Sequence, residues 1–143
     1  MFCMRESILR DFFRRRASTS ELKADLAGTL VQKSSDVSHQ YVEAMESEFK
    51  VSPEHLVHLC DAVLSGDLDA TELKAIGFCI VSSDHFHWEA DTPMGERVAE
   101  TAYDWSSPET NYRLTIETVR KFRKRLLTGH NTLTHADHGG FKK

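Results

Sequence analysis

The histidines offer the most direct chemistry in this sequence. His85 and His87 are separated by one residue and are followed by two acidic residues, and zinc accepts two imidazoles with a carboxylate. His55 and His58 stand three residues apart, so a helix would place them on one face. No further histidine follows at a recognised spacing, and the sequence holds no phosphate-binding loop, CxxC, HExxH or GxSxG motif. We therefore predict no metal site, no cofactor and no catalytic residue, and we keep metal binding by His85 and His87 as the less favoured alternative.

The acidic residues are segregated along the sequence. The net charge of −4 divides into +3 for residues 1–33, −13 for residues 34–109 and +6 for residues 110–143. A field this one-sided can steer and hold a basic partner, whereas it repels phosphate groups. Aromatic residues interleave with the acids, as they do in binding hot spots. We predict a partner-binding surface formed by Asp84, Phe86, Trp88, Glu89, Asp91, Glu96, Glu100 and Asp104.

These features also have a purely structural explanation. The basic ends of the chain could pack beside the acidic middle and neutralise it, and the aromatic residues could close one edge of the core. The cations of residues 113–125 fit the outer face and the C-terminal end of a last helix, so we expect no direct contact with nucleic acid. Both explanations of the acidic segment stay open at this point.

Apolar periodicity predicts an all-α fold, a compact antiparallel bundle of five to six helices in a single domain over residues 1–129. Residues 5–16 form the first helix, and the later starts are capped by Ser18, Ser52, Asp69, Thr92 and Thr115. Glycine stops are expected at Gly28, Gly66 and Gly129. Residues 31–40 and 84–92 are predicted loops, residues 41–51 fit either a helix or an extended segment, and residues 130–143 form a disordered tail.

Two helices carry the clearest burial predictions. Residues 69–80 are apolar almost all round, with Phe78 among the inward positions, so we expect this segment to be the most buried. The last helix has the cleanest amphipathic stripe, and its expected inward positions are Ile116, Val119, Phe122, Leu126 and Leu127.

Composition limits the class of protein. The 143 residues are 40% hydrophobic and 28% charged, which suits a folded domain. The longest uncharged run, residues 75–83, is too short to span a bilayer, and the N-terminus lacks the pattern of a secretory signal. Cys3, Cys60 and Cys79 show no close pairing, as expected in a reducing compartment, so we predict a cytoplasmic location. The oligomeric state is not predicted.

Three segments of the sequence resemble the colicin D immunity protein family, small helical inhibitors that occupy the active site of a tRNA-cleaving toxin domain. They are residues 9–13 with 19–22, residues 78–86, and Asn111-Tyr112 before residues 115–120. The resemblance implies an acidic surface that imitates tRNA phosphates, with Asp84, Glu89 and Asp91 in the acidic positions. An additional helix is expected between Asp91 and Asn111, where the family has no counterpart. Its acids, Glu96, Glu100 and Asp104, are therefore assigned to the surface because of their charge and not because of the resemblance.

These lines of reasoning predict a bacterial immunity-type inhibitor that blocks a basic nuclease toxin domain through its acidic surface and catalyses no reaction itself. A helical adaptor with a non-toxin partner is the alternative.

Overall fold

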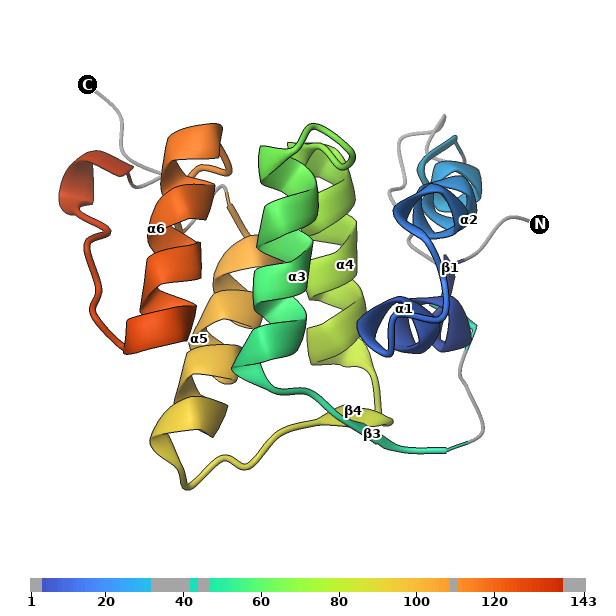
Figure 1. Cartoon of the computed structure of the whole chain (residues 1–143), viewed down its shortest axis with the longest axis horizontal. Coiled ribbons are helices and arrows are strands. Elements are labelled where there is room, and N and C mark those ends of the chain that lie inside the picture. The colour runs from blue at the N-terminus through green and yellow to red at the C-terminus, as the bar shows by residue number, and fades with distance from the viewer. Residues whose placement is uncertain (1–3, 32–41, 44–46, 109–110, 138–143) are drawn as a thin grey trace.

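The computed structural model describes residues 4–31, 42–43, 47–108 and 111–137 (Figure 1). Within these ranges the chain forms six α-helices, which confirms the predicted all-α fold. The helices are α1 (Glu6–Phe13), α2 (Thr19–Val31), α3 (Pro53–Leu64), α4 (Ala70–Ser82), α5 (Pro93–Ser106) and α6 (Ile116–Thr128). Four two-residue strands and one 3-10 helix complete the described elements: β1 (Met4–Arg5), β2 (Val42–Glu43), β3 (Phe49–Lys50), β4 (Phe86–His87) and η1 (His135–Asp137).

Side-chain caps define where the helices begin. The backbone N–H of Glu21 donates to the Ser18 hydroxyl (3.1 Å), and the Glu21 carboxylate accepts from the Ser18 N–H (2.8 Å). Asp69 and Glu72 form the same reciprocal arrangement at α4 (2.8 and 2.9 Å). These bonds satisfy backbone donors that the first helical turn leaves unpaired. The predicted helix starts at Ser18, Ser52, Asp69, Thr92 and Thr115 are therefore confirmed.

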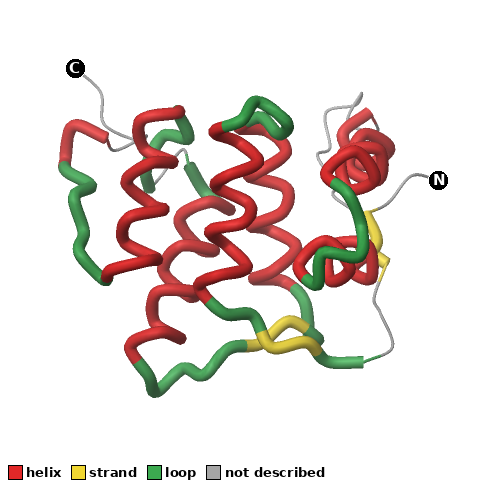
Figure 2. The backbone as a smooth tube through the Cα atoms, viewed as in Figure 1, coloured by secondary structure: helices red, strands yellow, loops and turns green. Residues whose placement is uncertain are grey.

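Two short parallel ladders join segments that are far apart in the sequence; their strands are yellow in Figure 2. Residues 49–50 pair with residues 86–87, and residues 4–5 pair with residues 42–43. Because β3 leads into α3 and β4 follows α4, α4 must return to the end of the bundle from which α3 starts. The α3 and α4 helices therefore run antiparallel, and their connecting loop lies at the opposite end (Figure 1). The sequence of residues 41–51 fitted either a helix or an extended segment, and the structure is extended at residues 42–43 and 49–50.

All six helices contribute residues to one buried core. Trp105 and Phe122 are fully buried and pack edge-to-face, with ring centroids 6.0 Å apart. Gly77 lets α4 approach α5 closely, because a Cβ at this position would lie 2.8 Å from the Trp105 Cβ. Arg97 of α5 donates to the carbonyl of Leu126, near the C-terminal end of α6 (3.3 Å). Since Trp105, later in α5, meets Phe122, earlier in α6, these two helices also run antiparallel.

The structure differs from several of the local predictions. Helix α2 continues through Gly28 to Val31, so Gly28 is not a helix stop. Phe78 is exposed although its neighbours in α4 are buried, and Ile116 and Leu127 of α6 are about half exposed. These positions lie at the margins of apolar stripes, where the packing of the neighbouring helix decides burial. The predicted loop over residues 31–40 falls almost entirely outside the described residues, while the loop over 84–92 contains β4.

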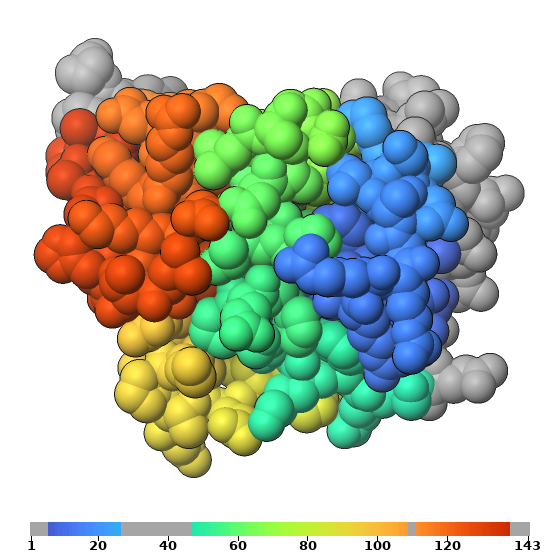
Figure 3. Space-filling view, in the orientation of Figure 1, coloured from blue at the N-terminus to red at the C-terminus, as the bar shows by residue number. Residues whose placement is uncertain are grey.

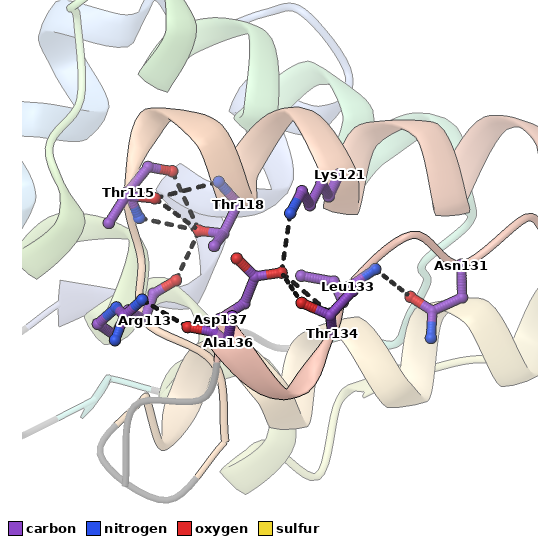
Figure 4. Close-up of polar contacts among 9 residues, drawn as sticks. All are labelled: Arg113, Thr115, Thr118, Lys121, Asn131, Leu133, Thr134, Ala136 and Asp137. Atoms are coloured by element: carbon purple, nitrogen blue, oxygen red, sulfur yellow. Dashed lines mark hydrogen bonds and ion pairs between the residues drawn. The ribbon is translucent and has the colours of Figure 1, made fainter. Parts of the chain in front are cut away.

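Residues 130–137 differ from the predicted disordered tail, because they pack against α6 (Figure 4). Leu133 is buried, and the Asp137 carboxylate accepts hydrogen bonds from the Lys121 ammonium (2.9 Å) and the Thr134 N–H (3.0 Å). The Arg113 N–H donates to the Asp137 carbonyl (2.9 Å). The segment before α6 and the segment after it are thus joined. The rest of the predicted tail, residues 138–143, lies outside the described residues.

Candidate protein-binding surface

The outward side of α5 carries a stripe of exposed residues. Pro93, Glu96, Glu100 and Tyr103 follow one another at spacings of three, four and three residues, which places them on one face of the helix. The Glu100 side chain is 63% exposed and Tyr103 is 53% exposed. Asp91, also exposed, lies just before the helix. We call Asp91, Pro93, Glu96, Glu100 and Tyr103 the acidic α5 face.

The turn before α5 has little room for other side chains. The Thr92 hydroxyl donates to the Glu89 carbonyl (2.8 Å) and accepts from the Gly95 N–H (3.0 Å). A Cβ at Gly95 would overlap the Glu89 carbonyl oxygen, so only glycine fits here. The turn therefore fixes where Asp91 stands relative to the start of α5.

The other acids predicted for the surface differ in their freedom to bind. Asp84 is exposed between α4 and β4. Glu89 is exposed too, but its carboxylate accepts a hydrogen bond from the Lys50 ammonium (2.8 Å). That hydrogen bond and the lysine charge hold the pKa of Glu89 below its usual value. A partner would have to displace or include Lys50, so Glu89 contributes less free negative charge than the sequence indicates.

Asp104 belongs to the interior of the protein rather than to the acidic surface. Its side chain is 16% exposed and accepts a hydrogen bond from the buried Arg125 guanidinium (3.0 Å). The same nitrogen of Arg125 donates to the Thr101 hydroxyl (3.0 Å), and the guanidinium lies 5.3 Å from the centre of the Phe122 ring. The placement of Asp104 on a partner-binding surface is therefore corrected: its charge neutralises Arg125.

The two predicted aromatic anchors are not exposed anchors either. Phe86 is 3% exposed and packs against Phe13 and Phe49, with ring centroids 6.1 Å away in both cases. Trp88 is half-buried and packs against the core. The structural explanation of these aromatics therefore holds, since they close one edge of the core. Tyr103 takes their place as the exposed aromatic, and its helical spacing from Glu96 and Glu100 could have indicated this.

His85 and His87 lie in different surroundings. The His85 Nδ1 lies 3.3 Å from the buried carboxylate of Glu6, while the His87 Nε2 lies 3.7 Å from the Glu48 carboxylate, so the two rings have different neighbours. Within the described part of the chain, no group of three or more His, Cys, Asp or Glu residues could hold a metal ion. The alternative of metal binding by His85 and His87 therefore finds no third ligand among these residues.

The two described cysteines are structural. Cys60 and Cys79 are fully buried, and burial raises the pKa of both thiols far above the usual value. A thiol in this environment packs as a small hydrophobic group and is a poor nucleophile.

Comparison with known proteins gives no further guide: no family model, no curated protein and no solved structure matches the chain. Among the described residues, no helix is both long and apolar enough to cross a membrane. The function must therefore be inferred from the surfaces themselves.

Proposed function

We propose that this protein is a non-enzymatic inhibitor of the immunity type, which binds a basic, nuclease-type toxin domain through the acidic α5 face. The observation that carries the proposal is the exposed stripe of Glu96, Glu100 and Tyr103 on one side of a single helix. A rigid helix holds its carboxylates at fixed spacings. Fixed spacings are needed if the carboxylates are to pair with an array of lysine or arginine side chains on the partner.

Most of the charge on this face is free to meet a partner. Asp91 and Glu96 form no ion pair with another described residue, and Glu100 lies at the outer limit of contact with Arg125 (4.0 Å). Arg97, the one cation of α5, turns away and donates to the Leu126 carbonyl. The negative potential therefore extends into solvent, where it can accelerate the encounter with a basic partner.

Tyr103 supplies the apolar part of the contact. A tyrosine loses little conformational entropy on binding and is enriched among interface residues that dominate affinity. With the carboxylates of Glu100 and Glu96 one and two turns earlier, it provides an aromatic anchor beside an electrostatic guide. This combination predicts a complex that is steered by charge and retained by the packing of one ring.

The proposal is tested with a matched pair of charge reversals. Glu96 and Glu117 are both exposed carboxylates in the first turn of a helix, α5 and α6 respectively. Glu96→Lys and Glu117→Lys therefore change the net charge equally and disturb similar helix-dipole interactions. Wild type and both variants serve as baits in lysate of the source organism at low and at high salt, and retained proteins are identified by mass spectrometry.

The proposal requires a basic protein that is retained by wild type and by Glu117→Lys, released by high salt, and lost with Glu96→Lys. The purified pair should then show weakening of about 2 kcal/mol or more for Glu96→Lys, about thirty-fold in Kd, and inhibition of the partner's nuclease activity by wild type. A basic partner that both variants bind equally would refute the assignment of the α5 face. A partner held by salt-insensitive contacts would favour the helical adaptor instead.

A further inference from the structure

A groove runs between α3 and α6 on a side of the molecule to which α5 contributes no lining residue. It consists of two adjoining hollows of about 420 and 320 Å³, which share Asp61 of α3 and Leu127 of α6 as lining residues. The first hollow lies between α3 and α6, and the second extends to the turn between α1 and α2. Figure 3 shows these three segments, in green, orange and blue, meeting on one face. We call this feature the α3–α6 groove.

Four cations line the groove together with two carboxylates, Asp61 and Glu54, and three of the cations belong to the first hollow. Arg120, Arg123 and Lys124 of α6 line one hollow, and Arg15 lines the other. Arg123 forms an ion pair with Asp61 (2.6 Å), whereas Arg120 and Lys124 form none with another described residue. The sequence predicts that these cations lie on the outer face and at the C-terminal end of the last helix. The structure instead sets them along a concavity large enough for a small molecule, so they can act together on one anionic ligand.

The second hollow carries imidazole rings supported by aromatic ones. The His58 ring stacks on Phe12 with 4.2 Å between centroids and 6° between planes, and the His55 ring stacks on Phe13 at 5.1 Å. Burial is the main cause of the lowered pKa of both histidines; the Arg15 charge acts in the same direction, while Glu54 at His55 and Asp61 at His58 oppose it. The Ser52 N–H also donates to the His55 Nδ1 (2.9 Å), which requires that nitrogen to be unprotonated. Neutral rings held flat in this way resemble the platforms on which nucleic-acid bases stack.

Arg15 is held beside the histidines by an unusual backbone conformation. Its φ of 61° is the one positive value at a non-glycine among the described residues. The N–H groups of Arg15 and Arg16 donate to the carbonyls of Phe12 (3.0 Å) and Asp11 (2.7 Å), a helix end that normally places glycine where Arg15 stands. An arginine at this position costs stability, and it sets a cation at the rim of the second hollow.

From this arrangement we propose that the α3–α6 groove binds a nucleotide, with its phosphate held by Arg120 and Lys124 and its base facing the His58 ring. Asp61, between the two hollows, can accept a hydrogen bond from a ribose hydroxyl or an exocyclic amine. An inorganic anion would use the cations alone, and an acidic peptide would leave the rings uncovered. A nucleotide uses the cations, the carboxylate and the rings together.

The proposal stands apart from the inhibitor function. None of Asp91, Glu96, Glu100 and Tyr103 lines the groove, so variants of one surface leave the other intact. Nucleotide binding is also measured on the protein alone, without a toxin. Loss of either proposal therefore leaves the other standing.

The test is a titration of the full chain at low salt with AMP, a fluorescein-labelled oligoribonucleotide of eight adenosines, sodium pyrophosphate and an acidic oligoglutamate. Arg120→Ala/Lys124→Ala removes the phosphate contacts. Arg16→Ala/Lys74→Ala, two exposed cations that line neither hollow, is the matched control. His58→Gln removes the ring while keeping a polar side chain. Circular dichroism establishes that each variant folds.

We expect AMP to bind, with Kd about tenfold higher in the Arg120/Lys124 variant and unchanged in the control. His58→Gln should weaken AMP but not pyrophosphate. If the oligonucleotide is the natural form, a plot of log K against log salt concentration has a negative slope. In the Arg120/Lys124 variant that slope should be less negative by about 1.4, because two phosphate contacts are removed. The proposal is overturned if nothing binds, if pyrophosphate or oligoglutamate binds as tightly as AMP, or if the control variant weakens binding as much as the groove variant.

Discussion

The ion pair between Arg125 and Asp104 should be the most sensitive polar contact in the core. Arg125 is almost fully buried, and one of its nitrogens donates to both Asp104 and Thr101 at 3.0 Å. Its Nε is buried without a hydrogen-bond partner. Replacing Asp104 with alanine removes the carboxylate closest to the guanidinium and leaves a buried charge with one neutral hydroxyl. We expect Asp104→Ala to destabilise the fold strongly.

The size of the effect follows from the geometry. Breaking a fully buried ion pair costs about 3–5 kcal/mol, and one hydrogen bond to a charged group contributes about 1.5–3 kcal/mol. Asp104 keeps some exposure, and the Glu100 carboxylate, 4.0 Å from Arg125, can partly replace it. The loss should therefore be smaller than for a fully buried pair, and we expect a decrease of about 2–3 kcal/mol in the free energy of unfolding. Tm should fall by about 5–10 °C.

Urea denaturation provides the assay, followed by the fluorescence of the two tryptophans, Trp88 and the buried Trp105, and by circular dichroism. Glu100→Ala is the control, because this carboxylate is largely exposed and its loss should cost less than about 0.5 kcal/mol. Asp104→Ala combined with Arg125→Met completes a double-mutant cycle. Since the double variant no longer buries an unpaired charge, it should recover part of the loss seen in Asp104→Ala.

One result would refute this reasoning. If Asp104→Ala changes stability no more than Glu100→Ala does, then Arg125 does not depend on Asp104 in solution. Asp104 would then be an available surface carboxylate, and its place on the partner-binding surface, corrected above, would have to be restored.

Three further predictions concern other contacts. Gly77→Ala would set a methyl group 2.8 Å from the Trp105 Cβ, so α4 and α5 must separate; we expect a loss of about 2–3 kcal/mol, measured by urea denaturation. Arg15→Gly should raise stability by about 0.5–1 kcal/mol, because glycine adopts the positive φ of this helix end without strain, and an unchanged or lower urea midpoint would contradict that. His55 and His58 have lower pKa values in the folded protein than in the unfolded chain, so the unfolded chain takes up protons at a higher pH. The free energy of unfolding should therefore keep the contribution of these histidines above about pH 6.5 and decrease as the pH falls below it. The His55→Gln/His58→Gln variant should lose that part of the pH dependence in denaturation curves recorded between pH 5 and 8.

Helix boundaries could be predicted from the sequence because they depend on neighbours in the chain. The reciprocal bonds of Ser18 with Glu21 and of Asp69 with Glu72 join residues three positions apart, so the residue types alone indicate them. Gly28 is the exception, because the local preference of glycine to end a helix is weak enough for α2 to continue through it.

The candidate surface could be predicted only in part, because exposure is decided by residues far away in the sequence. Asp104 follows Glu100 by four residues and looks like another member of the same acidic stripe. What distinguishes it is Arg125, which reaches it from the next helix. In the same way, Phe86 sits among acids in the sequence but is covered by Phe13 and Phe49, from two other segments of the chain.

The long separation between α3 and α6 has a consequence for how the protein folds. Five residues, 65–69, join α3 to α4, whereas residues 65–115 lie between α3 and α6, so closing that contact costs about 2 kcal/mol more in chain entropy. The α3–α6 contact should therefore form later in folding than the contacts between helices that are adjacent in the chain. A ligand bridging α3 and α6 would slow the exchange of the α6 amides, because it would bind to both sides of that contact.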